Sequence, residues 1–453
     1  MAAPNTDFSQ GSIWKNIVRM SIPITLAQLI NILYNIVDRM YIGHIPGAGA
    51  LALTGLGLCL PVISIVMAFA RLSGMGGGPL CSIERGKGDL QEAERIMGNS
   101  FTLLMIFAVA LTFLGEVFLR PILMAFGASN DTIGYAMDYG RIYLAGNVFV
   151  LISLGMNNFI NAQGFARTGM VTTLVGAVLN IVLDPIFIFV LDWGVKGAAT
   201  ATVISQAVSA LWVMQFLTGK RAQLRLRWEN LKLNAQRTGR ILALGFSGFV
   251  MAFTNSAVQV VCNSVLSSYG GDLYVGVMTV LSSIREVVSM PVQGLTGAAE
   301  PVLGFNYGAR KMYRVRQGIR FISVCALAYS LLVWGIIRGM PGPLIRIFNK
   351  EDHLVQTAVP ALGIYFATFF MMALQFAGQS TFVSLGKSKQ AVFFSIFRKV
   401  IIVVPLTILL PKLSYFGVNG VFWAEAISNV IGGIACYGTM YVTVYRPLGQ
   451  QTG

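Results

Sequence analysis

Charged residues are scarce in this chain of 453 residues, and their scarcity excludes an ordinary soluble protein. Asp, Glu, Lys and Arg together make up 11% of the sequence, whereas soluble domains carry about a quarter. Hydrophobic residues make up 55%, and the mean hydropathy is +0.69. An apolar excess of this size over so long a chain is typical of an integral membrane protein.

Histidine and cysteine are also rare, which argues against a catalytic or metal centre. The two histidines, His44 and His353, both fall in predicted outer loops. The five cysteines stand singly, without CxxC or other ligand spacing, and we interpret them as small core residues. We therefore expect no metal, no bound cofactor and no enzymatic activity. A membrane-embedded enzyme such as an acyltransferase would need a catalytic His or a metal cluster within a span.

Long apolar runs account for most of the sequence. A helix needs about 20 apolar residues to cross roughly 30 Å of hydrocarbon, whereas a membrane β-barrel would show shorter, alternating segments. The pattern predicts an all-α integral membrane protein with twelve transmembrane helices. The runs lie near 17–43, 50–78, 97–118, 133–163, 168–191, 197–218, 241–268, 273–300, 317–340, 355–383, 389–411 and 418–443.

The net charge of +15 could suggest nucleic acid as a partner, but the positions of the charges exclude it. Most of the 33 basic residues fall at the inner ends of the runs, and few fall at the outer ends. This bias follows the positive-inside rule. We therefore expect a multi-pass protein of the cell (inner) membrane with both termini in the cytoplasm.

The two halves of the chain resemble each other at a nearly fixed offset. Residues 74–89 align with 296–311 at 222, residues 194–206 align with 417–429 at 223, and Asn31 falls opposite Asn255 at 224. Six spans return the chain to its starting side, so the halves share one orientation and are related by an axis along the membrane normal. Internal repeats of this kind are a signature of secondary transporters.

The repeats predict two six-helix lobes, 1–218 and 241–453, joined by a basic linker at 219–240. Apolar residues alternate with arginines in the linker. We expect it to lie as an amphipathic stretch on the anionic inner leaflet.

Carboxylates inside membrane spans are costly and are candidates for function. Asp38 and Asp184 lie in the outer parts of the first and fifth spans, and Asn180 precedes Asp184 by one helical turn. Thr202 and Tyr34 fall at a similar depth. We expect these five residues to form a site for a coupling cation or proton. The alternative is structural: Asp38 pairs with the adjacent Arg39 or caps a kinked backbone, and Asp184–Pro185 is only a bend.

The second half places basic residues inside its spans. Arg285 lies beside Glu286 in the eighth span, and Arg398 and Lys399 lie well inside the eleventh. One interpretation is a buried network in which Glu286 or Glu425 neutralises an arginine. The other is a positively charged wall of a substrate cavity formed by Arg398, Lys399, Glu286 and Arg285, which would favour anionic or zwitterionic substrates.

Three segments together resemble the multidrug and toxic compound extrusion (MATE) family, and within it the branch containing MepA and DinF. They are Asn-x-x-x-Asp-Pro at 180–185, the VDRMYIG context of Asp38, and MPVQGLTGAAEPVLGFNYGARK at 290–311. The resemblance implies a V-shaped pair of six-helix lobes around a central cavity. It also implies a first-lobe cation site at Asp38, Asn180, Asp184 and Thr202, whose carboxylates change protonation.

The chain departs from the family pattern at two points. Some members hold a second cation with carboxylates of the seventh and tenth spans, but 241–268 and 355–383 contain no Asp or Glu. We therefore expect that second site to be missing. The branch usually has Gln where this chain has Glu300, to which we assign a solvated role.

The sequence thus predicts a secondary transporter that exports amphipathic organic compounds in exchange for protons by alternating access. Its expected partners are small organic substrates and membrane lipids, and it is expected to act as a monomer. The alternatives are a sodium-coupled antiporter of the same family and a lipid-linked saccharide flippase. A flippase would use Arg285, Arg398 and Lys399 for substrate phosphates, but the motif at 290–311 argues against it.

Overall fold

The computed structural model describes residues 7–348 and 351–450, and regular structure in this part of the chain is helical. The first half contains α1 (Ile13–Gly43), α2 (Gly49–Lys87), α3 (Leu90–Ala125), α4 (Ile133–Ala145), α5 (Asn147–Leu151), η1 (Ile152–Met156), α6 (Asn157–Ala162), α7 (Ala166–Pro185), η2 (Ile186–Val190), α8 (Gly194–Thr218) and η3 (Trp228–Asn230). The second half contains α9 (Ala235–Gly308), α10 (Met312–Gly339), α11 (Pro341–Phe348), α12 (Asp352–Tyr365), α13 (Phe369–Ser384), α14 (Ser388–Ile396), η4 (Phe397–Val403), α15 (Val404–Leu409), η5 (Leu410–Lys412), η6 (Gly417–Asn419), α16 (Gly420–Met440), η7 (Tyr441–Tyr445) and α17 (Arg446–Gln450).

The described helices account for the predicted number of spans. Nine are long and apolar enough to cross a membrane, and two bent pairs raise the number to 11. The pairs are α4 with α5–α6, bent by 59°, and α12 with α13, bent by 50°. The long helix α9 contains a kink at Gly271, where φ is 69°, and it therefore supplies two spans. With this division the described residues hold twelve spans, and the all-α membrane fold is confirmed.

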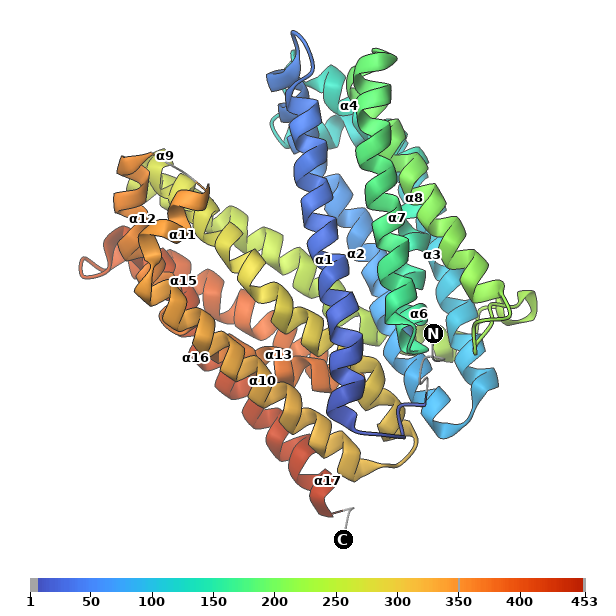
Figure 1. The fold of residues 1–453 in the computed structure, drawn as a ribbon. Coiled ribbons are helices and arrows are strands. Elements are labelled where there is room, and N and C mark those ends of the chain that lie inside the picture. The colour runs from blue at the N-terminus through green and yellow to red at the C-terminus, as the bar shows by residue number, and fades with distance from the viewer. Residues whose placement is uncertain (1–6, 349–350, 451–453) are drawn as a thin grey trace. The chain divides into compact units, whose positions relative to one another are not determined.

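The chain folds into two compact units. Of the described residues, unit 1 comprises 7–8 and 22–249, and unit 2 comprises 9–21, 250–348 and 351–450. In Figure 1 the helices of 22–249 run from blue to green and those of 250–453 from yellow to red. Helix α1 contributes to both units, and Pro23 follows the division between them by two residues.

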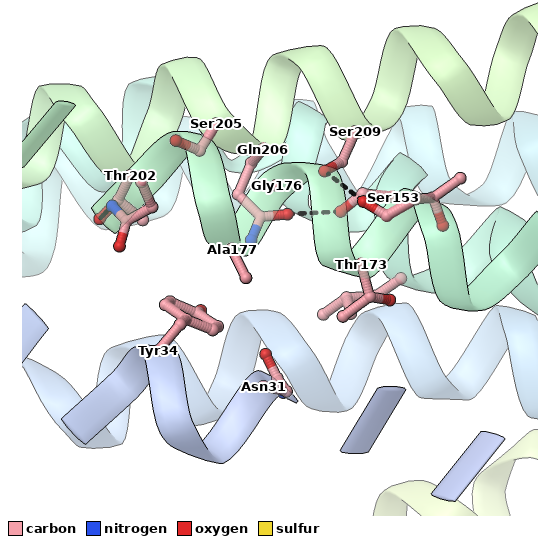
Figure 2. A pocket seen from close by; sticks show the side chains of 13 residues that line it. Asn31, Tyr34, Ser153, Thr173, Gly176, Ala177, Thr202, Ser205, Gln206 and Ser209 are labelled. Carbon is pink, nitrogen blue, oxygen red and sulfur yellow. Dashed lines mark hydrogen bonds between the residues drawn. The ribbon is translucent and has the colours of Figure 1, made fainter. Parts of the chain in front are cut away.

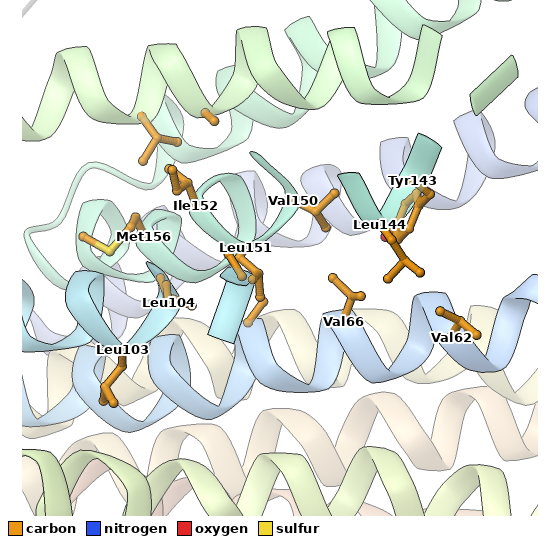
Figure 3. Close-up of a cluster of buried hydrophobic side chains, with 14 of the residues drawn as sticks. Val62, Val66, Leu103, Leu104, Tyr143, Leu144, Val150, Leu151, Ile152 and Met156 are labelled. Carbon is orange, nitrogen blue, oxygen red and sulfur yellow. The ribbon is translucent and has the colours of Figure 1, made fainter. Parts of the chain in front are cut away.

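A continuous apolar core holds unit 1 together. Side chains of α2, α3, α4, α5 and η1 meet there, and α8 packs on α4 and α7. Figure 3 shows Val62 and Val66 of α2 facing Leu144 of α4 and Val150 of α5. One face of each of these helices thus packs into the core of unit 1. Large apolar residues elsewhere, such as Val109 and Phe113, remain exposed and suit contact with lipid.

The linker at 219–240 is attached to unit 1 by hydrogen bonds from buried amides. Asn99 Nδ2 donates to the carbonyls of Asn230 and Lys232, and Asn99 Oδ1 accepts from the Asn234 amide. Gln163 Oε1 accepts from the amide of Leu224, whose side chain is fully buried. Trp228, in contrast, is 89% exposed. Part of this amphipathic stretch therefore packs on protein, and the exposed tryptophan suits the lipid interface.

Unit 2 has its own core, built mainly from α9, α10, α12, α13 and α16. Its eleventh span is irregular, because the π-helical segment η4 separates α14 from α15. A π-helical segment, η2, also follows α7 in unit 1, directly after Asp184 and Pro185. π-Bulges of this kind frequently mark functional sites. Each of the two segments borders one of the polar clusters described next.

Candidate functional site

The polar centre of unit 1 is formed by two buried aspartates. Asp38 lies near the end of α1 and is 6% exposed, and Asp184 lies at the end of α7 and is fully buried. The two carboxyl groups are within hydrogen-bonding reach of each other. Two ionised carboxylates cannot form such a hydrogen bond, because both are acceptors. The geometry therefore fits a pair that shares a proton.

Neighbouring amide and hydroxyl groups complete the site. Asn180 Nδ2 donates to Asp184 Oδ1 at 3.2 Å and contacts Thr202 Oγ1 at 3.4 Å. Tyr34 lies within electrostatic range of both aspartates. Tyr139 of α4, which is buried, lies beside Thr202. The structure thus brings together the five residues that the sequence singles out, and it adds Tyr139.

Three oxygens of this site are buried acceptors that receive no hydrogen bond in the part of the chain that the structure describes. They are Asp38 Oδ1, Asn180 Oδ1 and Asp184 Oδ2. Burying an acceptor without a donor costs about 1–3 kcal/mol. A proton, a water molecule or a small cation bound among these oxygens would remove that cost. Arg39 follows Asp38 in the chain, but its side chain is exposed. It therefore does not supply the missing hydrogen bond to Asp38 Oδ1.

A cavity of about 30 Å³ reaches this site at Asn180 and Thr202. A single water needs about 10–15 Å³ by this measure, so the cavity can hold water. Figure 2 shows Asn31 and Tyr34 of α1 facing residues of α7 and α8 across it. The lining consists of Asn31, Tyr34, Ser153, Leu154, Thr172, Thr173, Gly176, Ala177, Asn180, Thr202, Ser205, Gln206 and Ser209, and most of these residues have a polar side chain.

Unit 2 contains a second buried polar cluster, with three cations around one carboxylate. Glu425 Oε1 lies 2.6 Å from Arg285 Nη1, 2.8 Å from Arg398 Nη1 and 3.5 Å from Lys399 Nζ. Arg398 Nη1 also donates to Asn429 Oδ1 at 2.7 Å, and Arg285 Nη1 donates to the Tyr365 hydroxyl at 2.9 Å. The cations come from α9 and η4, and the carboxylate comes from α16.

The two acidic residues considered with these cations in the sequence have different positions. Glu425 is 5% exposed and contacts all three cations. Glu286 is exposed, although it follows Arg285 in the chain. Glu300 is half-buried near the end of α9. Of the two acids considered for neutralising an arginine, Glu425 is therefore the one that the geometry places there.

Gly432 of α16 makes room for the side chain of Arg398. A Cβ atom at position 432 would lie 2.8 Å from both Cγ and Cδ of Arg398. Without a side chain at 432, the stem of Arg398 can lie against α16 and place its guanidinium beside Glu425 and Asn429. The fold therefore admits a long cation into a buried position.

Several residues of the two clusters are not recognisable from the sequence. Tyr139, Gln206 and Ser153 in unit 1, and Tyr365 and Asn429 in unit 2, are single polar residues within apolar spans. Nothing in their spacing separates them from polar residues that satisfy a neighbouring backbone carbonyl. The sequence shows how deep in the span each of these residues lies. It does not show which face of the helix carries the side chain.

Comparisons with known proteins agree with this architecture. The family model MatE matches residues 23–186 and 248–409, one segment in each half of the chain. The multidrug export protein MepA of Staphylococcus haemolyticus is 24% identical over 426 residues, which cover 94% of this chain and 92% of the relative.

Solved structures show the same fold. A crystal structure of MATE in the bent conformation has a TM-score of 0.93 and 24% identity, covering 99% of both chains. A MOP superfamily transporter from Pyrococcus furiosus has a TM-score of 0.91 and 23% identity, covering 100% of this chain and 99% of its own. That transporter is described as having a binding pocket of reverse polarity that suggests a different function.

The family model covers well over half of the chain, its two segments coincide with the two repeats, and the relatives align from end to end. The chain belongs to the MATE family of membrane transporters.

Proposed function

We propose that this transporter exports amphipathic organic compounds in exchange for protons, and that Asp38 and Asp184 couple the two fluxes. The observation that carries the proposal is the buried pair of carboxyl groups within hydrogen-bonding reach of each other. Such a pair is stable when one proton lies between its members. The relatives named multidrug export proteins support the direction of transport and the class of substrate.

Coupling requires that the proton and the substrate favour different conformations of the same molecule. A protonated pair is compatible with the buried arrangement at the ends of α1 and α7. An unprotonated pair carries two adjacent negative charges in a low-dielectric place, and their repulsion favours a conformation that separates or hydrates them. We propose that movement of α1 relative to α7 within unit 1 is the step that proton binding controls, with both termini on the cytoplasmic side.

A sodium ion is the second candidate for the coupling ion, and one observation favours it. Asp38 Oδ1, Asn180 Oδ1 and Asp184 Oδ2 are buried acceptors without donors, and a hard cation prefers oxygen ligands of this kind. The proton and the sodium ion would then compete for the same oxygens. Transport under separate gradients distinguishes the two.

The test is transport of rhodamine 123, an amphipathic cation, in proteoliposomes that contain the purified protein. With an imposed proton gradient and no sodium, we expect the parent to move the dye against its concentration gradient. Asp38→Asn and Asp184→Asn should each reduce this transport at least about tenfold, because an amide cannot exchange a proton. A sodium gradient in the presence of a protonophore measures the alternative.

Asp138→Asn is the matched control. Asp138 is a partly exposed aspartate of α4 that pairs with Lys196 at 3.6 Å, and its replacement should leave transport unchanged. Retention of proton-driven transport by both buried variants would falsify the coupling role of the pair. Transport that follows the sodium gradient alone would replace the proton by sodium.

A further inference from the structure

The buried cluster of unit 2 carries more positive than negative charge. Arg285, Arg398 and Lys399 surround a single carboxylate, that of Glu425. Arginine keeps its proton in proteins, so the cluster carries a net charge of at least +1 even when Lys399 is neutral. Among the described residues, no second carboxylate pairs with these cations, and Glu286 is exposed. An uncompensated charge at this depth is costly.

The hydrogen-bonding capacity of the cluster is also incompletely used. Arg398 is 6% exposed, and its Nε is a buried donor without an acceptor in the described chain. Lys399 is equally buried and approaches Glu425 Oε1 only at 3.5 Å, although an ammonium group has three donors. All three cations converge on the same oxygen of Glu425. Donors are therefore present in excess, and acceptors are lacking.

The three cations of the cluster differ in exposure. The side chain of Arg285 is 19% exposed, whereas those of Arg398 and Lys399 are 8% exposed. Arg398 and Lys399 lie in the π-helical segment η4, where backbone geometry departs from the regular α-helix. Gly432 accommodates the stem of Arg398. The site thus has a more exposed cation at its margin and two buried cations behind it.

The internal repeat shows that the charged positions of the two units are not equivalent. At offsets of 223 and 224, Asp184 and Asp38 correspond to Thr407 and Cys262, which contact each other at 3.9 Å. Thr202 corresponds to Glu425, and Gly176, which lines the cavity of unit 1, corresponds to Lys399. Unit 1 therefore has an acidic pair beside a cavity, and unit 2 has cations in the equivalent region.

We propose that the Arg285–Arg398–Lys399 cluster binds an oxyanion group, a carboxylate or a phosphate, of an organic substrate. Guanidinium groups are suited to oxyanions because they offer paired donors in one plane. An added anion would balance the net charge and accept the unused hydrogen bonds of Arg398 and Lys399. That the anion belongs to a transported molecule rests on the proposed export function.

The experiment measures ligand binding to the purified, detergent-solubilised protein by thermal unfolding in titrations with benzoate, phenyl phosphate and methyl benzoate. Benzoate or phenyl phosphate should raise the midpoint temperature of the parent by mass action, and the uncharged ester should not. The tighter of the two anions identifies the oxyanion that the site prefers. Equal stabilisation by benzoate and its methyl ester, or none by either anion, would overturn the proposal.

Variants then locate the site. Arg398→Gln and Lys399→Gln should each weaken anion binding roughly tenfold, the effect of one charge-assisted hydrogen bond. Arg338→Gln is the matched control, because Arg338 is an exposed arginine of unit 2 that lies over Trp334 and outside the cluster. Affinities in the two cluster variants that stay within twofold of the control would show that the anion binds elsewhere.

Glu425→Gln should change anion affinity in the opposite direction. If the cluster were a purely structural network, this substitution would not raise anion affinity. Removing the carboxylate that pairs with these cations raises the net positive charge, so anion affinity should increase about tenfold while the unliganded protein becomes less stable. The anion should then restore part of the lost midpoint temperature. An unchanged or weakened anion affinity in Glu425→Gln contradicts the proposal. If Glu425→Gln does not fold, the anion affinity of Lys399→Gln still decides the test.

Failure of this proposal can be told apart from failure of the proposed function. Anion binding is measured without a gradient, so Asp38→Asn should bind benzoate as the parent does while losing proton-driven transport. If the parent binds the anion but transports neither rhodamine 123 nor benzoate under a gradient, the export function is wrong and the anion site stands. If transport is intact but the anion fails to bind, the anion site is wrong.

Discussion

At the scale of single residues, the two units bury charge in different ways. In unit 1 the buried charge belongs to Asp38 and Asp184, and a single proton halves this charge and removes the repulsion between the two carboxylates. In unit 2 the arginines cannot lose their protons, and Glu425 compensates one of them. The first cluster is therefore suited to exchange a proton, and the second is suited to hold an external anion. The two units thus differ in their buried ionisable groups: carboxyl groups in unit 1, and mainly guanidinium and ammonium groups in unit 2.

Glycine 432 provides a residue-scale test of how Arg398 is positioned. Gly432→Ala places a Cβ atom 2.8 Å from Cγ and Cδ of Arg398, so the arginine must move or the helices must separate. We expect overpacking to cost about 1–3 kcal/mol of stability and anion binding to weaken with the displacement of the guanidinium. Thermal unfolding with and without benzoate measures both effects.

Gly438→Ala is the control for this substitution. It lies on the same helix, α16, and its Cβ atom would meet nothing within 4 Å. This change should leave anion binding unaltered and leave stability unchanged or raised by up to about 1 kcal/mol. An equal loss of stability in the two variants would mean that packing against Arg398 is not the reason for glycine at 432.

At the scale of helices, the sequence predicts the spans well because each needs a long apolar run. It does not predict the breaks at 145–147 and 365–369. Gly146 lies at the first break, but glycine is frequent inside membrane helices, and the second break contains neither glycine nor proline. It also does not predict η4, because a π-helical segment has the same composition as the α-helix around it. Hydropathy reports how deeply a segment is inserted, whereas bends depend on tertiary packing.

The candidate sites were predictable to the extent that rare residues marked them. Asp38 and Asp184 stand out because carboxylates are unusual in spans, and helical periodicity places Asn180 beside Asp184. Tyr139 and Tyr365 do not stand out, since tyrosine is common in apolar helices. The pairing of Arg285 with Glu425 joins residues far apart in the chain, and no local pattern contains that contact.

The linker provides an element-scale prediction. Asn99 is fully buried and binds the backbone of residues 230, 232 and 234. Asn99→Ala removes these three hydrogen bonds, and we expect the linker to detach more often, with a cost of about 1–3 kcal/mol for the groups left unsatisfied. Limited trypsin digestion should then cleave several times faster at Arg227 and Lys232 than in the parent.

Asn35→Ala is the matched control for the linker, because the Asn35 amide bonds to the Asn31 carbonyl within its own helix. It should leave cleavage of the linker at the parent rate. Unchanged cleavage in Asn99→Ala would mean that the other contacts of the linker, such as those of Leu224 with Gln163 and of Arg237 with Glu92, hold it without Asn99.

At the scale of the whole molecule, the two repeats keep one helical architecture but differ in the sign of their buried charge. The family model matches both halves, and the offsets of 222 to 224 between equivalent motifs preserve the spacing of the helices. The charged positions have diverged: the acidic pair of unit 1 corresponds to Cys262 and Thr407, and Gly176 corresponds to Lys399. Duplication of the fold therefore does not imply duplication of the site.

Cys262→Asp tests whether the buried charge of unit 2 can be changed without affecting the aspartates of unit 1. The Cys262 thiol is buried and lies within electrostatic range of Arg285, Lys399 and Glu425, so an aspartate there would supply a second carboxylate to the cations. We expect benzoate affinity to fall roughly tenfold or more, because the resident carboxylate competes with the added anion. The proton binding that we propose for Asp38 and Asp184 lies in the other unit and should persist.

Cys262→Ser separates the effect of charge from the effect of changing the side chain. Serine is close to cysteine in size and is neutral, so its benzoate affinity should stay within about twofold of the parent, while that of Cys262→Asp falls. Proton binding, measured as the release of protons when each purified variant is titrated with base, should retain the contribution that Asp38→Asn abolishes. If Cys262→Asp left benzoate affinity intact, the cations of unit 2 would not be the anion's partners. If it abolished the contribution of Asp38, the two units would not set their ionic chemistry independently.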